Sequence, residues 1–90
     1  MANSKQQEKR VRTAARQRLE NLRYRTQIKT LSRRLGDAAE AGEAEQVADA
    51  HRKLTMLLDR ASARGAIHRN TAARKKSQAA RTAAGVPAEA

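Results

Sequence analysis

The sequence contains no cysteine, tryptophan or phenylalanine, and Tyr24 is the one aromatic residue among its 90 positions. The lack of cysteine excludes a disulfide framework and a thiolate metal site. No apolar run approaches the roughly 18–20 residues that span a bilayer, and the lysines near the N-terminus precede no apolar segment of the kind found in secretory signals. We therefore expect a soluble cytoplasmic protein without a membrane partner.

Large apolar residues are scarce as well. Leucine, isoleucine and valine together contribute 12 residues, about 13% of the chain, whereas alanine contributes 20. This fraction lies below the roughly 20% at which a high net charge predicts disorder. A chain of this length forms one domain at most, so we expect residues 1–90 to be a single domain without a sizeable core. Either the chain is disordered or a charged partner completes its fold.

The charge is large and unevenly distributed. Twenty Lys and Arg residues oppose nine Asp and Glu residues, which gives a net charge of +11. Residues 1–35 carry 11 basic and two acidic side chains, residues 36–64 carry four and six, and residues 65–90 carry five and one. Fourteen of the cations are arginine, whose planar guanidinium binds phosphate in a bidentate manner. Two basic arms around a near-neutral middle indicate phosphate binding with a defined geometry.

The residue types favour helix throughout, and no alternating pattern of β-branched or aromatic residues predicts a strand. Sparse glycines divide the chain into three expected helices, over about 5–41, 43–64 and 68–83. The sequence thus predicts an all-α fold, a three-helix bundle with a long basic first helix. Residues 84–90 are expected to form a flexible tail.

The helix ends carry recognisable signals. Ser4 is expected to cap the first helix, with Gln7 at the return position of a capping box. Gly42 and Gly65 suit helix ends that require a left-handed residue. Gly36 lies inside the first helical pattern, and a break there is a minority alternative.

Two apolar stripes predict how the helices pack. Heptad-like spacing predicts a core seam in each of the first two helices. The seam of the first helix consists of Tyr24, Ile28, Leu31, Leu35 and Ala38. The seam of the second consists of Val47, Ala50, Leu54, Leu57 and Ala61, with Leu58 beside it.

The first 20 residues do not share this seam. Their apolar residues, together with Leu22, point to the opposite side of the helix, and the second helix is long enough to reach only to about residue 20. Residues 1–20 should therefore project beyond the bundle by roughly 30 Å. Six of the 20 cations lie on this segment, and an isolated basic helix frays in solution. We expect residues 5–20 to become ordered on a polyanion.

No constellation of catalytic residues is present. His51 and His68 have no partners at metal-ligand spacing, and the chain lacks a glycine-rich phosphate loop or a nucleophile motif. We therefore predict no enzyme activity, catalytic residue, metal, cofactor or small-molecule substrate.

The expected mode of nucleic-acid binding follows from the scarcity of aromatic residues. One aromatic residue is too few for base stacking, so we expect helices that recognise the sugar-phosphate backbone and the shape of the nucleic acid. An acidic cluster at the first turn consists of Asp37, Glu40, Glu43 and Glu45. We expect it to be a solvated face, favourable near the start of the second helix, with a surface that faces away from nucleic acid as the alternative.

A block in the C-terminal half carries a specific resemblance. Residues 65–77 contain the pattern Gly-x-Ile-His-x-Asn-x-Ala-Ala-Arg-x-Lys-Ser. Earlier matches are Met1-Ala2-Asn3, Lys9-Arg10, Arg18-Leu19, Arg33-Arg34 and Asp59-Arg60-Ala61. At this length and charge, the chain resembles the bacterial small-subunit ribosomal protein family number twenty (S-twenty). The chain departs from many relatives after Ser77, where Gln78-Ala79 replace Arg-Leu.

The resemblance implies a structural constituent of the small ribosomal subunit in the cytoplasmic ribosome. It implies a three-helix bundle that binds small-subunit (16S) ribosomal RNA directly and early in assembly, through its first and third helices. The expected partners are this RNA and other small-subunit components, without homo-oligomers. The predicted RNA-binding residues of the first helix are Asn3, Lys5, Lys9, Arg10, Arg12, Arg16, Arg18, Asn21, Arg23, Arg25, Lys29, Arg33 and Arg34. Those of the third helix region are His68, Arg69, Asn70, Arg74, Lys75, Lys76 and Arg81.

Three other functions share some of these features. A nucleoid-associated DNA-binding protein would have similar charge but would usually dimerise on duplex DNA. A membrane-surface helix would need large apolar residues opposite its basic face, and that face is rich in alanine here. A regulatory coiled coil would need longer seams.

Overall fold

The computed structural model describes residues 2–85, with side chains from residue 4 onward, and contains three helices and no strand within that range. Helix α1 spans Ala2–Ala41, α2 spans Ala44–Ala63 and α3 spans Arg69–Ala84. The predicted all-α bundle with a long, projecting first helix is confirmed. Of the expected tail, residues 86–90 lie outside the described range.

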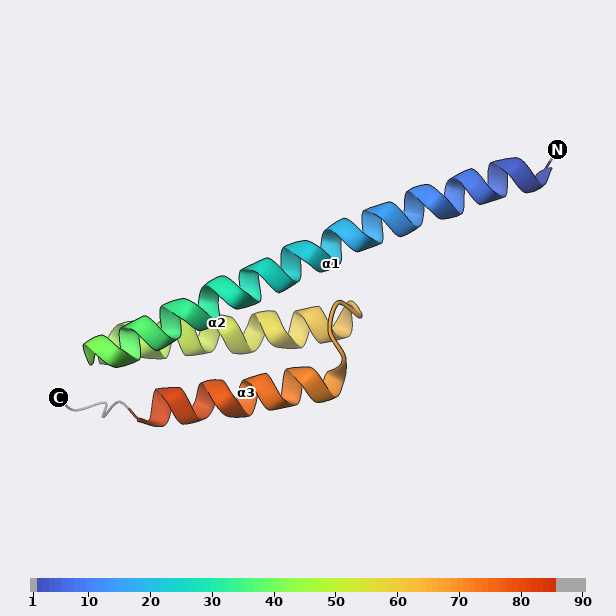
Figure 1. The fold of residues 1–90 in the computed structure, drawn as a ribbon. Helices are drawn as coiled ribbons and strands as arrows, with labels where there is room; N and C mark the ends of the chain where they lie inside the picture. The colour runs from blue at the N-terminus through green and yellow to red at the C-terminus, as the bar shows by residue number, and fades with distance from the viewer. Residues whose placement is uncertain (1, 86–90) are drawn as a thin grey trace.

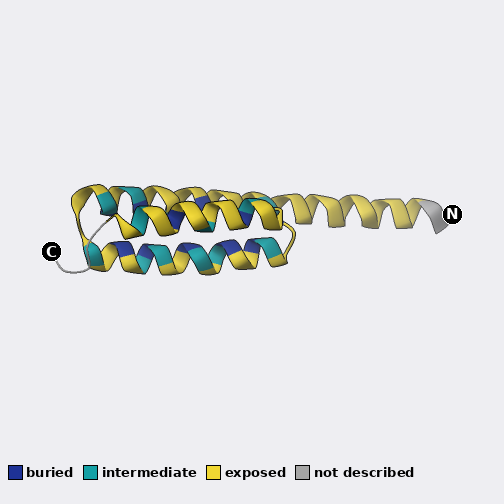
Figure 2. Ribbon diagram, turned by 90° about the horizontal axis from the view of Figure 1, so that it is seen from below, coloured by how far each residue is buried: buried dark blue, intermediate teal, exposed yellow. Residues whose placement is uncertain are grey.

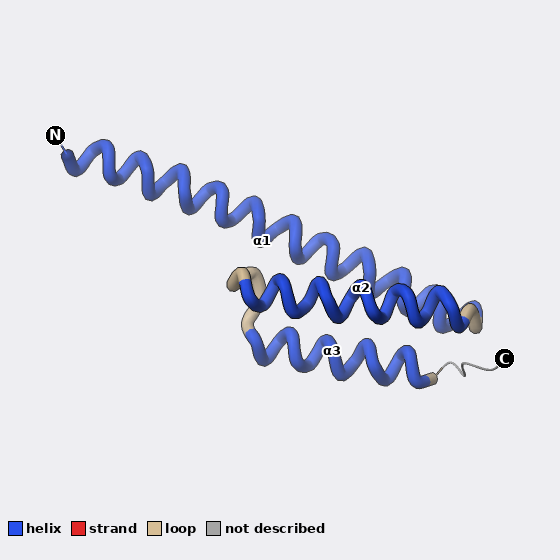
Figure 3. Tube along the Cα trace, turned by 180° about the vertical axis from the view of Figure 1, so that it is seen from behind, coloured by secondary structure: helices blue, strands red, loops and turns tan. Residues whose placement is uncertain are grey.

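Helix α2 lies between the other two, and α1 extends well past the bundle at its N-terminal end (Figure 1). The view from behind shows the same arrangement, with the loop between α2 and α3 on the side from which α1 projects (Figure 3). The molecule is correspondingly elongated, with principal extents of 68 × 20 × 13 Å.

The two turns are built by the glycines that the sequence singles out. Gly42 and Gly65 have positive φ angles of 69° and 77°. After Gly42, the N–H of Glu43 donates to the carbonyl of Ala38 at 3.1 Å, and after Gly65 the N–H of Ala66 donates to that of Ala61 at 2.9 Å. These bonds satisfy carbonyls left open at the end of each helix.

The start of α1 differs from the sequence-based expectation, whereas its interior agrees with it. The helix begins at Ala2, so Ser4 lies inside its first turn and the predicted cap at Ser4 is wrong. The backbone is already helical two residues before Ser4, whereas a capping residue must itself be non-helical. Gly36 lies within the continuous helix, so the minority alternative of a break there is not realised.

The core follows both predicted seams. The buried positions on α1 and α2 are Ile28, Leu35, Ala38, Val47, Ala50, Leu54, Leu58 and Ala61. Leu58, expected beside the seam, is fully buried, whereas Leu57 is half-buried. Helix α3 packs against both other helices, and its own buried residues are two alanines, Ala72 and Ala79. The buried side chains of the third helix are therefore all small, and the ion pair between Lys76 and Asp59 adds a polar contact to α2.

The N-terminal half of α1 has no partner within the described part of the chain. All side chains from residue 4 to residue 19 are exposed (Figure 2). The apolar residues Val11, Leu19 and Leu22 are 68%, 51% and 59% exposed. The reversal of the apolar face before Tyr24 therefore corresponds to the point where the helix leaves the bundle.

Candidate nucleic-acid interface

The cations of α1 fall into two rows along its length, and all of them are exposed. At about 100° per residue, the rows lie roughly 135° apart around the helix axis, and Arg10 falls in neither. The first cationic row consists of Lys5, Lys9, Arg12, Arg16, Arg23 and Arg34. The second cationic row consists of Arg18, Arg25, Lys29 and Arg33. The predicted contacts of α1 therefore cannot all face one surface of a partner.

The second cationic row meets α3. Arg25 and Lys29 line a groove of about 550 Å³ between the two helices, and His68 and Lys75 line it from the side of α3. Ile28 and Ile67 contribute its apolar lining, and no acidic residue borders it. This α1/α3 groove brings together four predicted RNA-binding residues that are up to 50 positions apart in the sequence.

His68 has a structural role that the sequence does not predict. It is the N-cap of α3, and its Nδ1 accepts a hydrogen bond from the backbone N–H of Asn70 at 3.1 Å. The acceptor atom carries no proton, so the neutral ring has its proton on Nε2. Of the two ring nitrogens, Nε2 therefore remains to donate to a ligand in the groove.

The remaining predicted residues of α3 are spread over several sides. Arg74 and Arg81 line a shallow hollow on the outer surface of α3, and Lys75 borders both this hollow and the α1/α3 groove. Lys76 points towards α2, where its Nζ lies 2.7 Å from Oδ1 of Asp59. Arg69 lies seven residues before Lys76 and thus on the same side of the helix.

The three asparagines among the predicted RNA-binding residues differ in how far their side chains are exposed. Asn21 is half-buried, and its Oδ1 accepts a hydrogen bond of 3.4 Å from Nε2 of Gln17. Asn70 is exposed. Asn3 lies in the first turn of α1, and its side chain is outside the described residues.

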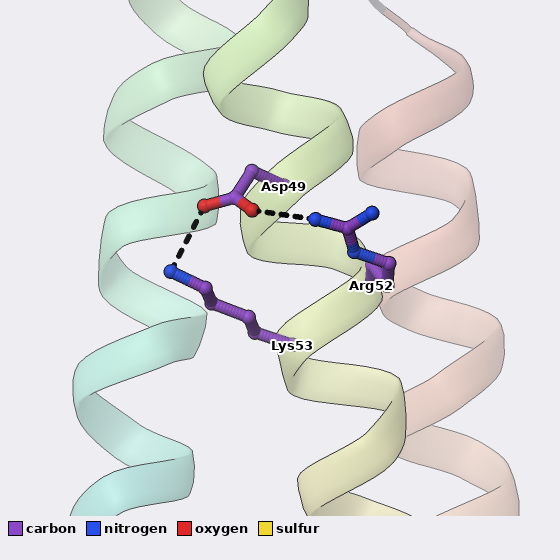
Figure 4. A network of polar contacts seen from close by, with 3 residues as sticks. All are labelled: Asp49, Arg52 and Lys53. Carbon is purple, nitrogen blue, oxygen red and sulfur yellow. Dashed lines mark hydrogen bonds and ion pairs between the residues drawn. The ribbon is translucent and has the colours of Figure 1, made fainter.

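The acidic residues gather at the turn between α1 and α2. Asp37, Glu43, Glu45 and Asp49 line a hollow at this end of the bundle. Asp49 pairs with Arg52 at 3.0 Å and with Lys53 at 3.1 Å (Figure 4). The hydrogen bond from Lys53, reinforced by its charge and by Arg52, lowers the pKa of the Asp49 carboxyl below its ordinary value. The four carboxylates outnumber the two cations that line the same hollow, Arg34 and Lys53, so we expect a polyanion to favour the rest of α1 and α3.

Neither a cluster of metal ligands nor a candidate membrane span occurs among the described residues. Residues 2–85 include no group of three or more His, Asp or Glu side chains placed to hold a metal ion. In the same part of the chain, no helix is both long enough and apolar enough to cross a membrane.

Known proteins match this sequence over nearly its whole length. Residues 2–84 match the family described as Ribosomal protein S20. The small ribosomal subunit protein bS20 of Kocuria rhizophila is 42% identical over 84 residues, which cover 93% of this chain and 98% of the relative. The proteins of the same name from Frankia casuarinae and from a Roseiflexus species are 43% and 44% identical. These two matches cover 98% and 90% of this chain, and 99% and 88% of the respective relative.

The matched segment contains all three helices and the α1/α3 groove, and its family is one of ribosomal proteins, not of enzymes. The predicted resemblance is confirmed, and the chain belongs to the ribosomal protein S20 family.

Proposed function

We propose that the protein is a structural component of the small ribosomal subunit that binds 16S ribosomal RNA directly and supports assembly of the subunit. The α1/α3 groove carries this proposal, because Arg25, Lys29, His68 and Lys75 converge there without an acidic neighbour. The names of the relatives place those proteins in the small subunit. A groove lined with cations on both sides fits the phosphate backbone of RNA.

The side chains on this surface favour recognition of the sugar-phosphate backbone and the shape of RNA over the stacking of bases. Tyr24 is half-buried and packs against the core, so it does not offer a stacking platform for a base. Double-stranded RNA is recognised largely through phosphates and 2′-hydroxyls. The Nε2–H of His68, an exposed residue, and the ammonium groups of Lys29 and Lys75 can donate to such oxygens.

The predicted contacts divide into groups with different expected contributions. Lys75 borders both the α1/α3 groove and the hollow on the outer surface of α3, so it should contribute most among the α3 residues. Lys76 is already paired with Asp59, so its contribution to RNA binding should be smaller. The six cations before residue 20 supply contacts beyond the bundle, where residues 5–20 lie along the RNA.

Substitution of Lys75 tests the proposal. We expect Lys75→Gln to weaken binding to 16S ribosomal RNA by about 5-fold at moderate salt, and to lower the salt dependence by about one phosphate contact. Affinity is measured by filter binding or electrophoretic shift over a series of salt concentrations, with duplex DNA as a competitor at matched salt.

The matched control is Arg52→Gln, which removes one exposed cation of α2 that lines neither the α1/α3 groove nor the hollow on the outer surface of α3. Its affinity for the RNA should equal that of the wild type. Equal losses in both variants would mean that only total charge matters. Stronger competition by duplex DNA than by unlabelled ribosomal RNA would favour a DNA-binding function instead.

A further inference from the structure

A second groove lies between α1 and α2, on the side of the bundle away from α3. Its volume is about 420 Å³, and its floor is formed by Leu31, Met56 and Leu57. Met56 is 57% exposed, and it is the exposed large apolar residue of the bundle, since Val11, Leu19 and Leu22 lie before Tyr24 on α1. This α1/α2 groove is separate from the α1/α3 groove that carries the proposed function, and it shares no lining residue with it.

The rim of the α1/α2 groove is cationic. Arg34 lines it from α1, and Lys53 and Arg60 line it from α2. Lys53 pairs with Asp49, whereas Arg34 and Arg60 take part in no ion pair within the described part of the chain. No acidic residue borders the groove. Two guanidinium groups without an ion-pair partner in the described residues, one from each helix, thus line the same groove as its apolar side chains.

The cations continue beyond the groove along both helices. Arg34 belongs to the first cationic row, which runs on through Arg23 and Arg16 to the projecting segment. Helix α2 runs back alongside α1, and Arg64, the C-cap residue of α2, follows Arg60 one turn later. The basic surface is therefore far longer than its apolar floor. An extended polyanion fits this shape better than an acidic helix, which would need an apolar stripe along its whole length.

We propose that the α1/α2 groove is a second RNA-binding surface, on which a ribose-phosphate strand lies with its phosphates against Arg34 and Arg60. The carbon faces of the riboses then cover Met56 and Leu57. This inference rests on the proposed binding of ribosomal RNA, and it makes α2 an RNA-binding element. The near-neutral charge of residues 36–64 conceals this role, because five of the six acidic residues of that segment lie between residues 37 and 49, and the sixth, Asp59, pairs with Lys76 of α3.

Substitution at Arg60 tests the surface against the same matched control. We expect Arg60→Gln to bind 16S ribosomal RNA about 5-fold more weakly than Arg52→Gln, with a salt dependence lowered by about one phosphate contact. Both variants remove one exposed arginine from α2, so their net charges are equal. Equal affinities of Arg60→Gln and Arg52→Gln would overturn the inference. If the wild-type protein fails to bind the RNA at all, the proposed function itself is wrong.

A crosslink from the floor of the groove keeps the test independent of folding losses. A photoreactive side chain at position 56, in the otherwise full-length protein, is irradiated within assembled small subunits. We expect it to crosslink to 16S ribosomal RNA, at nucleotides distinct from those reached by the same group at position 75. A crosslink to a ribosomal protein would show that the groove binds a protein segment, and the absence of any crosslink would show an unoccupied surface. Either result contradicts the inference.

Discussion

His68 shows how a single residue can combine two tasks. Its Nδ1 caps α3 through the backbone N–H of Asn70 at 3.1 Å, and its ring also lines the α1/α3 groove. The sequence predicts a donor at this position but not a cap, because the usual capping residues are Ser, Thr, Asp and Asn. The cap fixes the plane of the ring, so the direction of the Nε2–H bond is set before any ligand arrives.

Gly36 offers a test of the continuity of α1. The residue is helical, and a Cβ added to it would meet no atom within 4 Å. We expect Gly36→Ala to raise the free energy of unfolding by about 0.5–1 kcal/mol, because alanine loses less backbone entropy than glycine in a helix. Urea denaturation followed by circular dichroism measures the change.

Gly42→Ala is the matched control for this substitution. The space around Gly42 is equally open, but its φ angle is +69°. An alanine there must adopt a left-handed conformation and should destabilise the protein by about 1 kcal/mol. Destabilisation by Gly36→Ala would mean that α1 is broken or bent at this position in solution.

Among the elements, α1 and α2 are the ones whose packing the sequence predicts best. Their apolar residues repeat with helical period, so the sequence alone assigns Ile28, Leu35 and Leu54 to the core, where all three are buried. The position of α3 could not be predicted in this way. Its buried residues are alanines, and alanine also occupies exposed positions of the same helix, such as Ala73 and Ala80. A pattern of one residue type does not define a face.

The same limit applies to the candidate site. The sequence identifies basic residues by type and by resemblance, but whether they meet depends on the rotation of α3 about its axis. That rotation brings Lys75 to α1 and turns Lys76 towards Asp59. Of two adjacent lysines, one thus lines the α1/α3 groove and the other forms an ion pair with α2. The cations of α2 are hidden from a sequence-based prediction, because the net charge of a whole segment averages over the separate faces of the helix.

The projecting half of α1 is an element without tertiary support. We expect the amides of residues 5–20 to exchange rapidly in the free protein and to become protected by at least about tenfold when 16S ribosomal RNA is bound. Unpaired basic helices are marginal in water, because cations at i and i+4 repel each other and no apolar face is covered. Hydrogen–deuterium exchange detected by mass spectrometry follows this segment directly.

The amides of residues 47–58 in α2 provide the internal reference, since they lie in the packed part of the bundle. They should be protected in both states. Strong protection of residues 5–20 without RNA would contradict the expectation that this segment depends on its partner.

At the scale of the whole molecule, the core is thin. Of the buried residues, those larger than alanine are five: Ile28, Leu35, Val47, Leu54 and Leu58. The expectation of a chain without a sizeable core is therefore met, whereas disorder is not what residues 2–85 display. Two antiparallel seams suffice to fold the bundle, and the stability that remains is expected to be modest.

We therefore expect bound RNA to contribute a large part of the total stability. At an RNA concentration 100 times the dissociation constant, the free energy of unfolding should rise by about 2.7 kcal/mol. Pulse proteolysis in urea measures this rise without interference from the absorbance of RNA. Transfer RNA at the same nucleotide concentration and salt is the control for charge alone, and an equal rise with transfer RNA would contradict selective binding.

The acidic turn at one end of the bundle also affects how the protein approaches a partner. Asp37, Glu40, Glu43 and Glu45 lie at the far end from the six cations of the projecting segment, on a molecule 68 Å long. This separation gives the free protein a long electric dipole. In the field of a polyanion the dipole experiences a torque, which turns the tip of α1 forward while the two molecules are still apart. Diffusional encounters are thereby oriented before contact, and raising the salt concentration shortens the distance over which this orientation acts.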